Sequence, residues 1–338
     1  LAQCTHTANC SLDGHVYYNK VLHGPSNPTD ATDPTRPVEG VTVALSGAAS
    51  GTVNTDANGA FGFGAVAGDV LLTAQPKSAT TADFDMALSS EDAARIAQYA
   101  VGLVNFSPNQ LLLGDVSNNG RVTSYDASLV AQKVVNYAFT FPVRTATGSD
   151  WGFFPNPSPT LHVTTAPGTT FDFAAGIWGD VTLNWTKPTG LTQGPLPAPV
   201  ASPATSGQRP LEPLGLRGPA GGAEIYLASG PRLVGQDVYE VVLGIMNADG
   251  ILGLDATLTY DARAVAIRDV RNTGIAKAFT LVQNDKGGEY ALALYGTSAM
   301  QASGEFLVVT LVFHAPVSGM PFSVSAEANE GQIPLSWS

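Results

Sequence analysis

The centre of the chain reads DVSNNGRVTSYD over residues 115–126, and the predicted fold is organised around this stretch. Calcium takes six to eight oxygen ligands, and a 12-residue loop supplies them from positions 1, 3, 5, 7, 9 and 12. Gly120 stands at position 6, where such a loop turns sharply. The alternative interpretation is a polar Asn-Gly turn before a capped helix. Agreement at each position favours Ca2+, with the side chains of Asp115, Ser117, Asn119, Thr123 and Asp126 and the carbonyl of Arg121 as ligands.

A helix is predicted after this loop, because a capping Thr or Ser precedes apolar residues at helical spacing. The same pattern occurs once earlier, after Ser89, and the two copies align at a constant offset. Such self-similarity indicates an internal duplication. The earlier copy predicts a degraded calcium loop over residues 81–92, in which Thr81 replaces the first acid and Met86 the turn glycine. Its ligands would be the side chains of Asp83, Asp85 and Asp92 and the carbonyl of Ala87.

The regions on either side of these repeats are rich in β-forming residues. Short runs of Val, Thr and aromatic residues fill residues 12–76 and 223–338, with Asn-Gly and Asp-Gly turn signals between them. Their regular spacing predicts strands of two β-sandwiches. Residues 187–222 are rich in Pro and Gly, which predicts a linker. The segment before it has strand-like runs at 171–173 and 181–185.

The predicted fold class is mainly β and multidomain, with two Ig-like or jelly-roll-like β-sandwiches flanking a small α-helical calcium-binding unit. The chain divides into six predicted segments. They are an N-terminal segment (1–11), a first sandwich (12–78), the helical repeats (79–140), an aromatic, Pro-rich extension (141–186), the linker (187–222) and a second sandwich (223–338).

Composition and motifs exclude several function classes. The net charge is −12, and nucleic-acid binding needs a basic footprint that this chain lacks. No apolar run reaches the roughly 18 residues that a membrane span requires. The histidines lack zinc-type spacing, and no Gly-x-Ser-x-Gly elbow occurs. The sequence therefore predicts a protein that is not an enzyme.

Three features predict a secreted or cell-surface protein whose signal peptide has been removed. The chain begins at Leu1 without an initiator Met. Cys4 and Cys10 would close a small disulfide loop in an oxidising compartment. Glycosylation sequons occur at Asn9, Asn105 and Asn184.

The duplicated loop–helix units resemble a type I dockerin, specifically over residues 114–127 and in part over 88–96. Dockerins bind cohesin modules through loop positions 10 and 11 and through the helix that follows. The resemblance therefore implies a role in partner binding for six residues of the two repeats. They are Ser90, Glu91, Gln98, Ser124, Tyr125 and Gln132.

The first sandwich region resembles carboxypeptidase-regulatory-like and collagen-adhesin B-type repeats. The resemblance rests on residues 14–17, 37–47 and 55–63. Those repeats are small Ig-like sandwiches that serve as spacers and stalks, so the resemblance implies architecture and no chemistry.

The C-terminal region is similar to a cohesin module. The similarity rests on residues 238–243, 250–261 and 304–313, and a generic Ig-like sandwich is the alternative. A chain with dockerin-like and cohesin-like modules would carry both halves of a docking pair. Head-to-tail contacts of this kind build an open filament unless they close into a ring.

We therefore expect an extracellular structural protein, stabilised by Ca2+. Its partners would be other copies of itself, or proteins that bear cohesin or dockerin modules. The alternative is a non-catalytic scaffold or adhesion component of a complex that binds or degrades polysaccharide. A row of exposed aromatic residues would favour that alternative, but the candidate row is expected in the core. It consists of Tyr17, Tyr18, Phe61 and Phe63.

Overall fold

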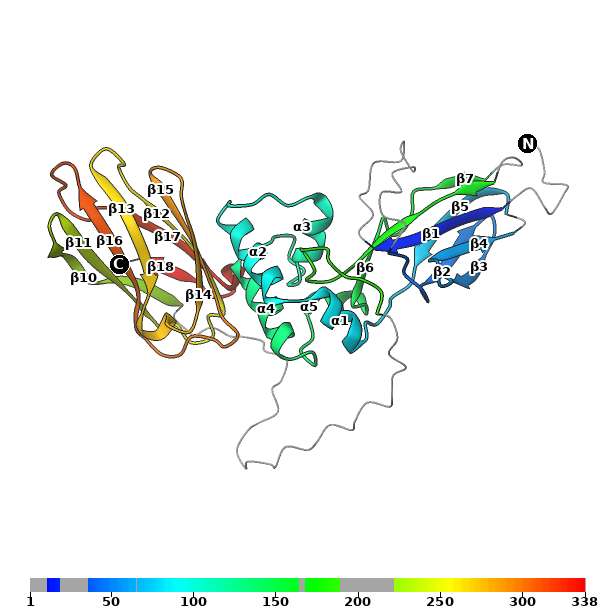
Figure 1. Ribbon diagram of the computed structural model, residues 1–338, viewed down its shortest axis with the longest axis horizontal. Coiled ribbons are helices and arrows are strands. Elements are labelled where there is room, and N and C mark those ends of the chain that lie inside the picture. The colour runs from blue at the N-terminus through cyan, green and yellow to red at the C-terminus, as the bar shows by residue number, and fades with distance from the viewer. Residues whose placement is uncertain (1–10, 19–35, 65, 164–167, 189–221, 338) are drawn as a thin grey trace, which may run out of the picture.

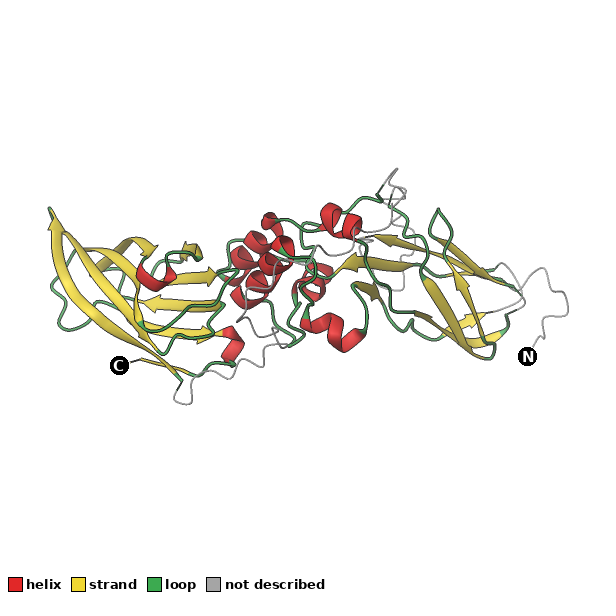
Figure 2. Ribbon diagram, turned by 90° about the horizontal axis from the view of Figure 1, so that it is seen from below, coloured by secondary structure: helices red, strands yellow, loops and turns green. Residues whose placement is uncertain are grey.

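The computed structural model describes residues 11–18, 36–64, 66–163, 168–188 and 222–337. Three bodies follow one another in a row: an N-terminal sandwich, a helical unit and a C-terminal sandwich (Figure 1). The view from below shows the helices between the two groups of strands as well (Figure 2). The prediction of a mainly β, multidomain chain with a small helical unit between two sandwiches is confirmed. None of the described helices is long and apolar enough to cross a bilayer.

The N-terminal sandwich has two sheets. One has the strand order β4-β1-β9-β6 with β8 beside β1, and the other has the order β3-β2-β5-β7. Alternate residues point into the core, as in β5, where Val70, Leu72 and Ala74 are buried. The strands are β1 (Leu12–Tyr18), β2 (Thr42–Gly47), β3 (Gly51–Asn54), β4 (Ala60–Phe63), β5 (Gly68–Ala74), β6 (Trp151–Phe154), β7 (Leu161–Val163), β8 (Thr169–Thr170) and β9 (Phe173–Ile177).

Residues 141–186 are not an extension, and this prediction was wrong. Strands β6 to β9 belong to the N-terminal sandwich, where β9 runs parallel to β1 with Val16 opposite Phe173. The helical unit is therefore inserted between β5 and β6. The error has a physical cause, because sequence periodicity describes a strand but not its distant pairing partner.

The run 181–185, predicted as strand-like, is a loop. Its backbone N–H groups donate to carboxylates instead of to a neighbouring strand. Val181 and Thr182 donate to Asp92 Oδ1 at 3.1 and 2.9 Å, and Leu183 donates to Asp180 Oδ1 at 2.6 Å. These side-chain acceptors replace the ladder that a strand would need.

The helical unit is built on the pair α2 and α4, which pack against each other (Figure 1). Both helices begin with a capping box, formed by Ser89 with Asp92 and by Thr123 with Asp126. The predicted duplication is therefore visible as two helices that start in the same way. The helices are α1 (Thr81–Ala87), α2 (Ser90–Ala100), α3 (Pro108–Gly114), α4 (Ser124–Val135) and α5 (Pro142–Thr147).

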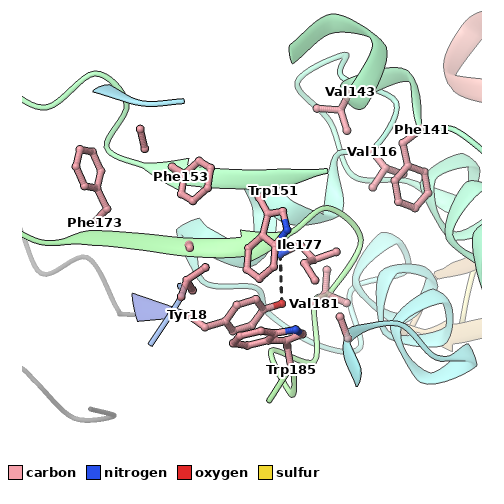
Figure 3. Close-up of a cluster of buried hydrophobic side chains, with 14 of the residues drawn as sticks. Tyr18, Val116, Phe141, Val143, Trp151, Phe153, Phe173, Ile177, Val181 and Trp185 are labelled. Atoms are coloured by element: carbon pink, nitrogen blue, oxygen red, sulfur yellow. Dashed lines mark hydrogen bonds between the residues drawn. The ribbon is translucent and has the colours of Figure 1, made fainter. Parts of the chain in front are cut away.

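One hydrophobic core runs through the N-terminal sandwich and the helical unit. At their junction Tyr18 stacks on Trp185 at 4.7 Å between ring centroids, and Trp151 meets both rings edge-on (Figure 3). Three residues of the candidate aromatic row, Tyr18, Phe61 and Phe63, are buried, as expected for core residues. The fourth, Tyr17, is half-buried and stacks on His15.

The C-terminal sandwich has one sheet in the order β13-β16-β11-β10-β18 and another in the order β14-β15-β12-β17. It has its own hydrophobic core between these sheets. The elements are β10 (Ala223–Gly235), β11 (Val238–Met246), β12 (Gly253–Thr259), β13 (Val265–Asn272), η1 (Gly274–Ala276), β14 (Thr280–Asp285), β15 (Glu289–Tyr295), β16 (Gly304–Phe313), β17 (Ser323–Ala328), η2 (Asn329–Gly331) and β18 (Leu335–Trp337).

Strand β15 is buried on both faces. Leu292 and Leu294 point into the sandwich's own core. Ala291, Ala293 and Tyr295 point outward and join the core shared with the helical unit. A strand with one free face would alternate between buried and exposed residues. Strand β15 is therefore buried on both faces because helices α2 and α4 pack against the outer face of this sheet.

Candidate functional site: a calcium-type loop at a docking interface

The loop between α3 and α4 folds back over its first residue, Asp115. The Asp115 carboxylate accepts hydrogen bonds from the backbone N–H groups of Asn119 at 3.0 Å and Gly120 at 2.7 Å. Gly120 has a φ of 86° and Asn118 a φ of 61°, a left-handed conformation that Gly and Asn adopt most readily. Asn118 and Gly120 therefore make the turn that the motif requires.

Asp126 closes the other end of the loop and is fully buried. Its Oδ1 accepts from the backbone N–H of Ser117 at 2.9 Å, and its Oδ2 accepts from that of Thr123 at 2.9 Å. Burial is the main cause that raises the pKa of Asp126 well above its usual range, and the neighbouring Glu330 carboxylate adds to it. A carboxyl group in these surroundings gains from a nearby cation.

The oxygen donors of this loop are of the chemical types that bind calcium. It offers the carboxylates of Asp115 and Asp126 with hydroxyl, amide and carbonyl oxygens, which are the hard ligands that Ca2+ prefers. Among the described residues, no group of three His, Cys, Asp or Glu side chains is placed to hold a metal ion. The site therefore depends on neutral oxygens of this loop as well, and Ca2+ stays a prediction.

The earlier stretch, residues 81–92, does not form a matching loop. Residues 81–87 are helix α1, whose N-terminus is capped by Thr80 with Asp83 in a capping box. Met86 has the place of the turn glycine, so a helix forms where the second repeat turns. Asp85 is exposed, and Asp92 binds the backbone of residues 181–182. Asp83, Asp85, Ala87 and Asp92 therefore do not lie along a calcium loop as predicted.

The start of α4 lies against the outer face of the C-terminal sandwich. The backbone N–H and the hydroxyl of Ser124 both donate to Asp255 Oδ2, at 3.2 and 3.0 Å. The Ser128 hydroxyl donates to the carbonyl of Leu252 at 2.5 Å. A Cβ on Gly253 would lie 2.5 Å from the backbone N of Tyr125, so the two backbones touch directly. We call this contact the docking interface.

The edge of the docking interface is ionic and runs along the calcium-type loop. Arg121 forms a bidentate pair with Glu327, with N–O distances of 2.8 and 2.6 Å. Thr123 Oγ1 donates to Glu330 Oε1 at 2.8 Å. Loop and sandwich are therefore joined by an ion pair and by a hydrogen bond from a hydroxyl to a carboxylate.

Two buried carboxylate oxygens at this interface have no hydrogen-bond partner among the residues that the structure describes. They are Asp255 Oδ1 and Glu330 Oε2, both from the C-terminal sandwich. Burial raises the pKa of Asp255 to about 6. A pocket of about 490 Å³ lies here, and its lining includes Asp115, Thr123 and Asp255. Unpaired buried carboxylate oxygens cost free energy, so a proton or a cation at this site would be stabilising.

Ser124 and Tyr125 are buried in the docking interface, whereas the other residues predicted to bind a partner are less enclosed. Ser90 lines a pocket with Tyr295 of the C-terminal sandwich. Glu91 is exposed and pairs with Arg95 at 3.1 Å. Gln98 and Gln132 are half-buried. A role of these four residues in partner binding remains a prediction.

The predicted modification sites are only partly described. Asn105 and Asn184 are exposed, which leaves their glycosylation a prediction. Cys4, Cys10 and Asn9 lie outside the described residues.

Several residues of the interface were missed by sequence reasoning. Asp255 and Gly253 lie in the cohesin-like stretch 250–261, but nothing local marks them as contacts. Glu327 and Glu330 are ordinary acidic residues in the sequence. They belong to the interface only because they contact Arg121 and Thr123 of the loop. No periodic or motif signal could have found them.

No protein-family model matches this chain, and no curated protein matches it. Among solved structures it is similar to a non-cellulosomal cohesin from the hyperthermophilic archaeon Archaeoglobus fulgidus, at 13% identity and a TM-score of 0.30, over 34% of this chain and 86% of that one. The seventh ScaB type I cohesin from Pseudobacteroides cellulosolvens is similar at 14% identity and a TM-score of 0.27, over 34% and 87%. A type I cohesin–dockerin complex from Clostridium thermocellum is similar at 17% identity and a TM-score of 0.27, over 34% and 87%. Likenesses at these TM-scores carry no functional argument, and function has to come from the contacts within this chain.

Proposed function

We propose that this chain is a non-catalytic, extracellular docking protein that forms a calcium-stabilised head-to-tail assembly. The helical unit of one copy would hold the C-terminal sandwich of the next. One observation carries the proposal: Ser124 and Tyr125, the two residues at loop positions 10 and 11, lie in the docking interface. These are the positions at which the dockerin resemblance implies partner binding.

The buried part of the docking interface supports specific docking. Ser124 and Ser128 are completely buried, and both donate hydrogen bonds to the sandwich. The direct backbone contact at Gly253 requires close shape complementarity. The Arg121–Glu327 pair is half-exposed, so it contributes about 1 kcal/mol or less and mainly fixes orientation.

The same contact can form within one chain or between two. The helical unit and the C-terminal sandwich are joined through the predicted linker 187–222, so docking within a chain benefits from a high effective concentration. Exchange of the C-terminal sandwich between copies would keep every contact and create a head-to-tail series, as in domain swapping. Linker length and protein concentration then decide which form dominates.

The experiment is a sedimentation series of the full chain in calcium, from low to high concentration, with electron microscopy of the most concentrated sample. A matched variant lacks residues 195–214, which shortens the linker and disfavours closure within one chain. We expect oligomers that grow with concentration, and more of them in the shortened variant. A strict monomer in both cases, at every concentration, contradicts the assembly.

The polysaccharide alternative has no comparable support. The candidate row of Tyr17, Tyr18, Phe61 and Phe63 would have to be exposed, but three of these residues are buried and Tyr17 is half-buried. No second function is therefore proposed.

A further inference from the structure

We propose that Glu330 of the C-terminal sandwich supplies an oxygen ligand to the Ca2+ of loop 115–126, so that one cation bridges the two docked bodies. This inference rests on the docking and the calcium loop proposed above. It goes further in making the cation site a shared one, because Glu330 would add an oxygen from the C-terminal sandwich to those of the loop.

The turn that carries Glu330 is held in an uncommon conformation. Asn329 and Glu330 have φ values of 46° and 58°, a left-handed region that residues other than glycine rarely adopt. Asn329 is fully buried, and its Oδ1 accepts from the backbone N–H groups of Leu252 at 2.8 Å and Gly253 at 3.0 Å. These bonds fix the turn and direct Glu330 toward the loop.

The Glu330 carboxylate is only half satisfied. Its Oε1 accepts from Thr123 Oγ1 at 2.8 Å, whereas Oε2 is buried and has no hydrogen-bond partner in the described part of the chain. The same hydroxyl oxygen lies 3.5 Å from Asp126 Oδ2. One hydroxyl has one proton and can donate to only one of the two carboxylates. Glu330 therefore stands beside a predicted ligand of the cation with a free oxygen.

Charge around the loop favours a cation between these groups. Arg121 is engaged in its bidentate pair with Glu327. Asp255 adds a buried oxygen without a partner to the same region. A divalent cation near Asp126 and Glu330 would offset their repulsion.

A shared cation couples binding to docking. If Ca2+ binds the docked form more tightly, then it stabilises docking by the same factor, because binding free energies are reciprocal. The calcium-free chain would dock less firmly, and the undocked chain would bind Ca2+ less tightly. Assembly would then respond to the calcium concentration of the surroundings.

The experiment measures the calcium affinity of the full chain by titration calorimetry, for the native chain, Glu330→Gln and Glu305→Gln. Glu305→Gln is the matched control, since it makes the same substitution at an exposed residue of the same sandwich, on strand β16 of the sheet that does not contact the helical unit. We expect Glu330→Gln to weaken affinity by about tenfold or more, as is typical when a metal site loses a supporting group. The control should weaken it by less than about threefold.

Three results would overturn the inference. They are equal affinities of Glu330→Gln and the native chain, equal losses in both variants, or a native chain that binds no Ca2+. Hydrogen exchange of the backbone N–H groups of α4 reports docking in the same samples. If α4 is protected and Ca2+ binds but Glu330 has no effect, only the shared site fails. If Ca2+ binds and α4 is unprotected, the docking itself fails.

Discussion

Asp180 is a buried carboxyl group at the junction between the N-terminal sandwich and the helical unit. The Tyr18 hydroxyl donates to its Oδ2, and Leu183 N–H donates to its Oδ1 at 2.6 Å. Burial, and then the nearby Asp92 carboxylate, raise the pKa of Asp180 to about 7. In the folded chain this group therefore keeps its proton at pH values where an unfolded aspartate has lost it.

This raised pKa makes stability depend on pH. Since the folded state binds the proton more tightly, the stabilisation is complete below about pH 4 and is lost as the pH rises to about 7. Asp180→Asn removes this titration. We expect the fall in the free energy of unfolding between pH 4 and pH 7 to become smaller by an amount on the order of a few kcal/mol. Tryptophan fluorescence measures it, because Trp151 and Trp185 lie beside the site.

Asp237→Asn is the control for this measurement. Asp237 is an exposed aspartate of the C-terminal sandwich, so the substitution makes the same chemical change at a distant, solvent-exposed place. Its pH profile should follow that of the native chain. A profile of Asp180→Asn that also follows the native chain would contradict the role of this carboxyl group.

Individual residues also set the limit of what the sequence could predict at the site. The ligand positions from Asp115 to Asp126 were predictable, since they are close in the chain and follow a fixed spacing. Glu330 and Asp255 come from a turn and a strand far along the chain. Their part in the site depends on how two bodies dock, and local patterns do not contain that information.

At the scale of elements, helix α4 packs against a sheet face that carries small side chains where the helix meets strand β12. Gly253 leaves no side chain between the strand and the backbone of Tyr125. On the neighbouring strand, Ala291 and Ala293 are buried under the helices. Small residues on this face let the helix pair approach the sheet closely.

Gly253→Ala should break this approach. Its Cβ would lie 2.5 Å from a backbone nitrogen, which cannot move as a flexible side chain can. We expect a loss of about 1–3 kcal/mol, typical of overpacking. Hydrogen exchange should show faster exchange at the start of α4, while the strands of the C-terminal sandwich keep their protection.

The control for this substitution is Gly230→Ala, on a strand of the same sandwich. A Cβ at Gly230 meets nothing within 4 Å. It should leave the exchange of α4 unchanged. Equal exchange of α4 in the native chain and in Gly253→Ala would mean that the two backbones are not in contact.

Elements with a strong local signal were predicted well. Helices α2 and α4 begin at their predicted caps, and strands such as β11 and β15 match the predicted β regions. Helix α1 was missed, because acidic residues in Thr81–Ala87 suggested a loop and its capping box was not recognised. Strands β6 to β9 were assigned to an extension, because their pairing with β1 and β5 spans a whole inserted unit.

At the scale of the whole molecule, the duplicated helical unit uses its two repeats differently. In the first repeat Asp92 binds residues 181 and 182 of the segment that follows strand β9, which ties α2 to the N-terminal side. In the second repeat Asp126 closes the calcium-type loop, and Ser124 contacts the C-terminal sandwich. The unit therefore has one attachment to the N-terminal side and one to the C-terminal sandwich, and the second is the one that the proposed exchange between copies would use.

The most direct test of this account is to cut the linker after the chain has folded. A protease site placed between residues 204 and 205 lies in the predicted linker and leaves both bodies intact. After cleavage in calcium, we predict that the two fragments remain together as a complex with one copy of each during size-exclusion chromatography at micromolar concentration. Gly253→Ala should release them under the same conditions. Fragments of the native sequence that separate at once would contradict the docking interface.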